Sequence, residues 1–212
     1  VYLVDRTIPM LPEHLSNGLC SLRPNEEKLC FSAVFELNEN AEVIKQWFGR
    51  TVIKSDRRFT YEEAQAMIEG EDGDFKTEII TLNDLAQKLR AARFQNGAIA
   101  FDRIEVRFDI DEKGKPTGVY FKRSKEANKL IEEFMLLANK KVAERIGKTK
   151  EGQKAKTFVY RIHEQPNTEK LEDFGRFIAK FGYKIRTTSP RQLSSSMNKL
   201  MEDVQNRPEQ NM

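Results

Sequence analysis

The sequence is poor in the residues that form covalent cross-links and metal centres. Cysteine occurs twice, at Cys20 and Cys30, and histidine twice, at His14 and His163. Two cysteines cannot build a disulfide framework, and these four residues lack the paired spacing of a zinc site. We therefore expect reduced thiols, a bacterial-type cytoplasmic location and no metal bound by these side chains.

Long apolar runs and a strong charge imbalance are also missing. No apolar run approaches the about 18 residues that span a bilayer, so no membrane partner is expected. Lys and Arg number 36 against 33 Asp and Glu, and a net charge of +3 does not by itself indicate a nucleic-acid partner. The hydrophobic content of 39% in 212 residues suffices for one sizeable core or two small ones.

A long helix over residues 123–146 is the element around which we expect the fold to be organised. Its sequence has no internal Gly or Pro, and Gly147 is a plausible C-terminal stop. Its apolar residues cover more than the roughly 100° stripe of a surface helix. They are Ala127, Leu130, Ile131, Phe134, Leu137, Ala138, Val142 and Ile146. The pattern predicts a largely buried helix.

Two adjacent glutamates fall on different sides of this helix. Glu133 is expected to point into solvent, whereas Glu132 lies at the edge of the apolar arc, near Asn128 and Asn139. A carboxylate and two amides along such a border can face a groove and bind hydroxyls or bases. The alternative is that all three side chains satisfy neighbouring backbone groups.

The other segments predict hairpins and shorter helices. We expect an irregular loop segment at 1–28, hairpins and two helices at 29–122, and a strand with two helices at 157–205. Apolar alternation predicts a first hairpin with one buried face, formed by Leu29, Phe31, Ala33, Phe35 and Leu37. It also predicts a half-buried strand at 104–110 and a buried strand at 158–162. The fold class is therefore α+β, with antiparallel β-hairpins and several α-helices packed around one long central helix.

Local capping signals mark three of the helix starts. Thr60-Tyr-Glu-Glu63 matches the capping box, which opens a short helix ending at Gly70 and places Tyr61 in its first turn. Ser189 followed by Pro190 predicts an N-cap with proline at the first helical position. Thr168 is expected to cap the first of the two helices in the segment 157–205.

Four segments resemble one known family. Residues 1–25, 58–64, 126–139 and 160–166 resemble, in the same order, the catalytic domain of ribonuclease R-type enzymes of the ribonuclease II (RNB) family. The sequence also opens inside an apolar segment without an initiator Met. We therefore expect residues 1–212 to be an internal piece of one such catalytic domain.

The resemblance implies a reaction and its cofactor. The parent would be a processive, Mg²⁺-dependent hydrolytic 3′-to-5′ exoribonuclease that degrades single-stranded RNA to nucleoside 5′-monophosphates, with cold-shock and S1-type RNA-binding domains elsewhere in its chain. Two-metal hydrolysis needs clustered carboxylates. The family's aspartate cluster precedes the position of Val1, and its arginine-rich catalytic motif follows Met212. We therefore expect no complete catalytic or metal site here, and an inactive piece.

What the resemblance does supply is RNA recognition. It assigns to Tyr2 the clamping of the terminal nucleotide and to Phe101 the stacking of a base, which is tolerant of sequence. It assigns to Tyr61 and Glu132 contacts with ribose that favour RNA over DNA. A 2′-hydroxyl both donates and accepts hydrogen bonds, so a phenol and a carboxylate suit it. His163 is expected to be a structural hydrogen-bonding residue.

Two other functions remain open at this stage. The chain could be a self-contained, non-catalytic RNA-binding domain, or a protein-interaction scaffold that uses the apolar faces of its hairpins.

Overall fold

The computed structural model describes two compact units of the chain. It describes residues 1–212 except 2, 5, 101–104, 149–151, 153, 155, 163 and 212. The first unit comprises Val1–Lys88 with Asp102–Val142, and the second comprises Leu89–Phe101 with Ala143–Met212. Two of the boundaries between the units, at 88/89 and 142/143, fall inside the long helices α2 (Lys76–Gln95) and α3 (Glu126–Gly147).

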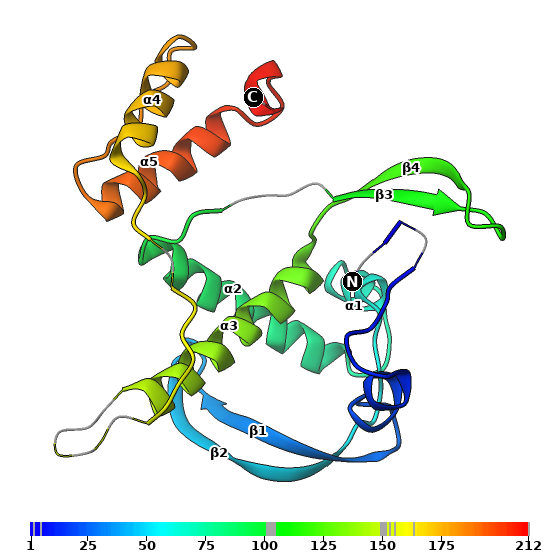
Figure 1. The fold of residues 1–212 in the computed structure, drawn as a ribbon. Coiled ribbons are helices and arrows are strands. Elements are labelled where there is room, and N and C mark those ends of the chain that lie inside the picture. The colour runs from blue at the N-terminus through cyan, green and yellow to red at the C-terminus, as the bar shows by residue number, and fades with distance from the viewer. Residues whose placement is uncertain are drawn as a thin grey trace. The chain divides into compact units, whose positions relative to one another are not determined.

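The elements confirm a mixed α+β fold (Figure 1). In chain order they are a π-helical turn η1 (His14–Leu19), β1 (Glu27–Leu37), β2 (Val43–Lys54), α1 (Tyr61–Ile68), α2 (Lys76–Gln95), β3 (Glu105–Ile110), β4 (Pro116–Lys122), α3 (Glu126–Gly147), α4 (Thr168–Ala179), α5 (Pro190–Asp203) and a 3₁₀ turn η2 (Pro208–Asn211). The predicted long helix is α3, which ends at Gly147 as expected. In the described part of the chain, no helix is long and apolar enough to cross a membrane.

The predicted first hairpin is confirmed as β1 and β2, but its predicted single buried face is wrong. Leu29 is 88% exposed and Phe31 is 76% exposed. At the start of β1 the opposite face is the more covered one, and there Lys28 donates a hydrogen bond from Nζ to the carbonyl oxygen of Gly18, at 3.1 Å. Alternation along a strand fixes only that neighbouring side chains point to opposite faces. Which face is covered depends on what packs there.

Two further predictions are wrong: the half-buried face of the strand at 104–110 and the buried strand at 158–162. The hairpin of β3 and β4 is a two-stranded sheet, and its cross-strand partners Val106 and Phe121 are both exposed. Residues 157–162 form no strand, and Val159 and Ile162 lie in solvent. A two-stranded hairpin buries a face only where a second layer packs on it.

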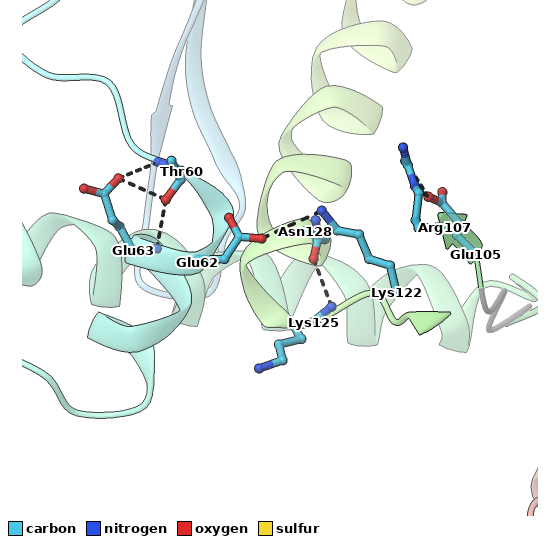
Figure 2. A network of polar contacts seen from close by, with 8 residues as sticks. All are labelled: Thr60, Glu62, Glu63, Glu105, Arg107, Lys122, Lys125 and Asn128. Atoms are coloured by element: carbon cyan, nitrogen blue, oxygen red, sulfur yellow. Dashed lines mark hydrogen bonds and ion pairs between the residues drawn. The ribbon is translucent and has the colours of Figure 1, made fainter. Parts of the chain in front are cut away.

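The predicted capping box at the start of α1 is confirmed. The Thr60 hydroxyl accepts a hydrogen bond from the Glu63 N–H, at 3.1 Å, and Glu63 Oε2 accepts one from the Thr60 N–H, at 2.7 Å. These bonds, the Thr60 backbone contact first, hold the pKa of the Glu63 carboxyl below its ordinary value. Figure 2 shows the box beside Lys122 of β4, whose Nζ lies 3.8 Å from a carboxylate oxygen of Glu62.

A buried side-chain amide joins α1 to α3. Gln65 is buried, and its Oε1 accepts a hydrogen bond from the Ala127 N–H, at 3.0 Å. Its Nε2 donates to Oε1 of Glu69, at 2.8 Å. Ala127 is in the first turn of α3, where backbone N–H groups have no partner within the helix. Gln65 therefore caps α3 from another element.

The second unit contains α4 and α5. Ser189 caps α5 through its hydroxyl with Pro190 in the first turn, as predicted, whereas α4 is capped by Asn167 and not by Thr168. Asn198 of α5 holds the segment that follows α2. Its Nδ2 donates to the Ala98 carbonyl oxygen at 2.8 Å, and its Oδ1 accepts from the Ala100 N–H at 2.9 Å.

We predict that Thr60→Ala lowers the free energy of unfolding by about 1 kcal/mol, because an N-cap oxygen is lost. Thr60→Ser, which keeps the oxygen, serves as the control and should stay near the wild type. Denaturant unfolding at pH 7 measures both.

The pH dependence of stability tests the role of Glu63. Because the folded pKa of the Glu63 carboxyl is lowered, the stability that this group confers is present above its unfolded pKa and is lost as the pH falls through the folded pKa. The gap between wild type and Glu63→Gln should therefore close on acidification, and a gap that widens would contradict this assignment.

We also predict that Gln65→Met destabilises the chain by about 1–3 kcal/mol, because the side chain keeps its approximate shape but leaves the buried Ala127 N–H without an acceptor. Gln46 on β2 is exposed, so Gln46→Met is the matched control and should change stability little. Equal unfolding midpoints for the two variants would show that the Gln65 hydrogen bond contributes nothing.

Candidate functional site

The first unit contains a cleft between α1, α2 and α3 with a volume of about 650 Å³. Its walls are mainly apolar and include Ala64 of α1, Ile79 and Leu82 of α2, and Leu130 and Ile131 of α3. Ligand pockets in proteins commonly occupy 300–1,000 Å³, with apolar walls and a few polar groups. The size and lining suit a group as large as a nucleotide.

Tyr61 lies at this cleft because of the capping box. As the first residue of α1 it follows Thr60 directly, and both residues line the cleft. Tyr61 is exposed, at 44% of its surface, so its side chain is open to solvent at the edge of the cleft. Within the described part of the chain, its hydroxyl has no hydrogen-bond partner. A phenol that is held by its helix start but is not satisfied internally can donate to, and accept from, a bound ligand.

Arg57 is a positioned cation at the same cleft that the sequence reasoning missed. Its guanidinium donates to Asp74 at 2.7 Å and lies 3.5 Å from a Glu63 oxygen. It also covers the ring of Phe59 at 4.6 Å, and Phe59 meets Phe75 edge to face at 6.3 Å. Two carboxylates already balance the charge of Arg57, so its role is to fix the wall of the cleft. The loop at 71–74 thus supplies one of these carboxylates.

Glu132 does not line the cleft, although its neighbour Ile131 does. Consecutive residues of an α-helix are turned by about 100° about its axis, and the Glu132 side chain is exposed and takes part in an interaction. The structure therefore brings Tyr61 and α3 together at one cleft, with Glu132 on the adjoining face of α3.

The prediction that Glu133 is solvated is wrong. Glu133 is only 3% exposed and shares the buried stripe of α3 with Ala127 and Leu130. The apolar arc of α3 is wider than its neighbours cover, so Ile131 and Met135 are exposed while the opposite edge is buried. Glu133 takes part in an interaction, as is usual for a buried polar residue.

Asn128 follows the alternative that the sequence left open. Its Oδ1 accepts a hydrogen bond from the Lys125 N–H, at 3.0 Å, so this side chain caps the start of α3 (Figure 2). Asn139 is exposed. The polar border expected along Asn128, Glu132 and Asn139 is therefore reduced to its last two members.

Three residues singled out from the sequence, Tyr2, Phe101 and His163, lie outside the described residues. Among those that are described, no group of three or more His, Cys, Asp or Glu side chains could hold a metal ion. The described side chains therefore do not fit a divalent metal centre.

Comparison with known proteins identifies the family. The RNB domain matches residues 1–212. DIS3-like exonuclease 2 of Schizosaccharomyces pombe is 38% identical over 94% of this chain and 23% of its own length. Ribonuclease R 1 of Lactococcus lactis is 37% identical over 89% of this chain and 23% of its own length. The chain thus spans about a quarter of the length of these relatives.

A solved structure shows the same fold. Mycoplasma genitalium RNase R in complex with ribose methylated single-stranded RNA matches 94% of this chain and 31% of its own, with a TM-score of 0.79 and 23% identity. The match to the RNB domain over residues 1–212 and the identity to these nucleases agree with this fold. The chain therefore belongs to the RNB-domain exoribonuclease family.

Proposed function

We propose that this chain is part of a processive hydrolytic 3′-to-5′ exoribonuclease that degrades RNA to nucleoside 5′-monophosphates, and that its own share of the work is to hold RNA. Membership of a family of exoribonucleases supports the reaction. The observation that carries the share of this chain is the apolar cleft of nucleotide size with the Tyr61 hydroxyl at its edge, which has no hydrogen-bond partner among the described residues.

The cleft and its borders divide the recognition of a nucleotide between them. The apolar side chains of α2 and α3 offer a surface to a base or the carbon face of a ribose, because removing apolar area from water is favourable. The Tyr61 hydroxyl can exchange a hydrogen bond with a sugar hydroxyl. Glu132, on the next face of α3, can accept a hydrogen bond from a 2′-hydroxyl, which DNA lacks.

Two-metal cleavage of the phosphodiester bond requires clustered carboxylates in addition to the cleft, Tyr61 and Glu132. The proposal places the carboxylates that would hold the Mg²⁺ ions expected for the family elsewhere in the parent enzyme. In the described part of this chain, no group of three or more His, Cys, Asp or Glu side chains could hold a metal ion. The chain by itself would bind RNA without cutting it.

We predict that Glu132→Ala lowers the ratio of RNA to DNA affinity by about tenfold, because a hydrogen bond to a charged group contributes about 1.5 kcal/mol or more. Fluorescence anisotropy with RNA and DNA strands of the same sequence measures this ratio. Glu172 is an exposed glutamate of α4, so Glu172→Ala is the charge-matched control. Tyr61→Phe should lower the ratio in the same direction. An unchanged ratio together with a large drop in melting temperature would assign Glu132 to stability instead.

We also predict that the 212-residue chain releases no nucleoside 5′-monophosphates from single-stranded RNA in Mg²⁺. Chromatography of the products measures this, with Ribonuclease R 1 of Lactococcus lactis as the positive control. Release that stops when EDTA removes the metal would contradict the proposed division of labour.

A further inference from the structure

Two hollows in the second unit meet along one face of α5. The first, of about 790 Å³, lies against the connection from α4 to α5, and the second, of about 510 Å³, lies against the end of α2. Arg191, Ser195, Lys199 and Asp203 line both hollows. These residues are four positions apart, so they share one face of the helix. The two hollows therefore have a common wall.

The first hollow carries an excess of positive charge, because four cations line it together with one carboxylate, that of Asp203. Lys184 and Arg186 of the connection line the first hollow together with Arg191 and Lys199. Within the described residues, none of these four cations has an ion-pair partner, whereas Arg176 on α4 is paired with Asp173. Cations held near one another repel when they outnumber the neighbouring carboxylates, and a bound anion relieves that repulsion.

The connection that carries Arg186 is held in place beside α5. The Arg186 N–H donates a hydrogen bond to the Ser196 Oγ, at 2.9 Å, and the Ser196 hydroxyl donates to the Leu193 carbonyl oxygen, at 3.0 Å. Ser195 is exposed, and within the described residues its hydroxyl has no partner. The hollow thus combines cations on a fixed backbone with a hydroxyl that remains available.

We propose that this cationic face, formed by Lys184 and Arg186 of the connection and by Arg191, Ser195 and Lys199 of α5, binds phosphate groups of the RNA backbone. Guanidinium groups form paired hydrogen bonds with phosphate, and ammonium groups act on it as point charges. Eight residues of helix separate Arg191 from Lys199 by about 12 Å along the axis, which is enough for more than one phosphate. The choice of RNA rests on the proposed function.

The chemistry of the cationic face also indicates which features of a nucleic acid it does not recognise. Contacts with phosphate position a nucleic acid without reading its bases, and phosphates are common to RNA and DNA. The cationic face should therefore add affinity that is independent of sequence and of the 2′-hydroxyl. The cleft at Tyr61 differs, because its contacts are proposed to select ribose.

The test compares two double variants that remove the same charge. Arg191→Gln with Lys199→Gln alters the cationic face, and Lys113→Gln with Lys115→Gln alters the exposed turn between β3 and β4. At low salt the first variant should bind single-stranded RNA about tenfold more weakly, since each exposed contact contributes at most about 1 kcal/mol. The logarithmic dependence of its affinity on salt should become shallower by about 1.4, the value for two lost contacts with a single strand. The control variant should change neither by a comparable amount.

The same measurements with DNA separate this proposal from the proposed function. The Arg191→Gln, Lys199→Gln variant should lose affinity for RNA and DNA by the same factor. Glu132→Ala should instead lower the affinity for RNA relative to the affinity for DNA. An equal loss in the Lys113→Gln, Lys115→Gln variant would assign the effect to net charge and overturn the site. Unchanged affinity and salt dependence in the α5 variant would also overturn it, even if Glu132 proves to select RNA. Circular dichroism and melting temperature confirm that the exposed substitutions leave the fold intact.

Discussion

The arrangement of the cleft depends on the hydrogen bond between the Gln65 side chain and the Ala127 N–H. The bond is buried, so its loss would leave a polar group away from water without a partner. It ties the second turn of α1 to the first turn of α3, and both helices contribute residues to the lining of the cleft. The side chain of Tyr61 belongs to the helix that this bond anchors. Its place at a cleft that α3 also lines therefore depends on a polar contact made elsewhere.

Local chemistry was predictable from the sequence, whereas burial was not. The caps at Thr60 and Ser189 involve residues only three positions apart, so a short stretch of sequence contains the whole interaction. The exposure of Leu29 and the burial of Glu133 depend on segments far away in the chain. A hydrophobic pattern reports which side chains could be covered, but not which of them have a neighbour. The hairpins were therefore predicted correctly as elements and wrongly as layers.

The candidate site divides in the same way. Tyr61 could be placed from its capping box, and the structure brings it to the cleft. Arg57 could not be recognised, because its partners Asp74 and Glu63 are distant or already assigned to a cap. The charges along α5 were also inconspicuous, since basic residues on a helix are usually well solvated. What distinguishes them is that two hollows meet at Arg191 and Lys199, which only coordinates can show.

The pair of hydrogen bonds made by the Asn198 side chain, called here the Asn198 clamp, determines which substitutions the segment after α2 can accept. One side-chain amide bonds to a carbonyl and to an N–H two residues apart, as the backbone of an adjacent strand would do. It recognises the main chain of Ala98 and Ala100 and none of their side-chain atoms. The clamp is therefore indifferent to the amino acids at these two positions, with one exception. Proline at position 100 would have no backbone N–H, so the hydrogen bond to the Asn198 Oδ1 would be lost.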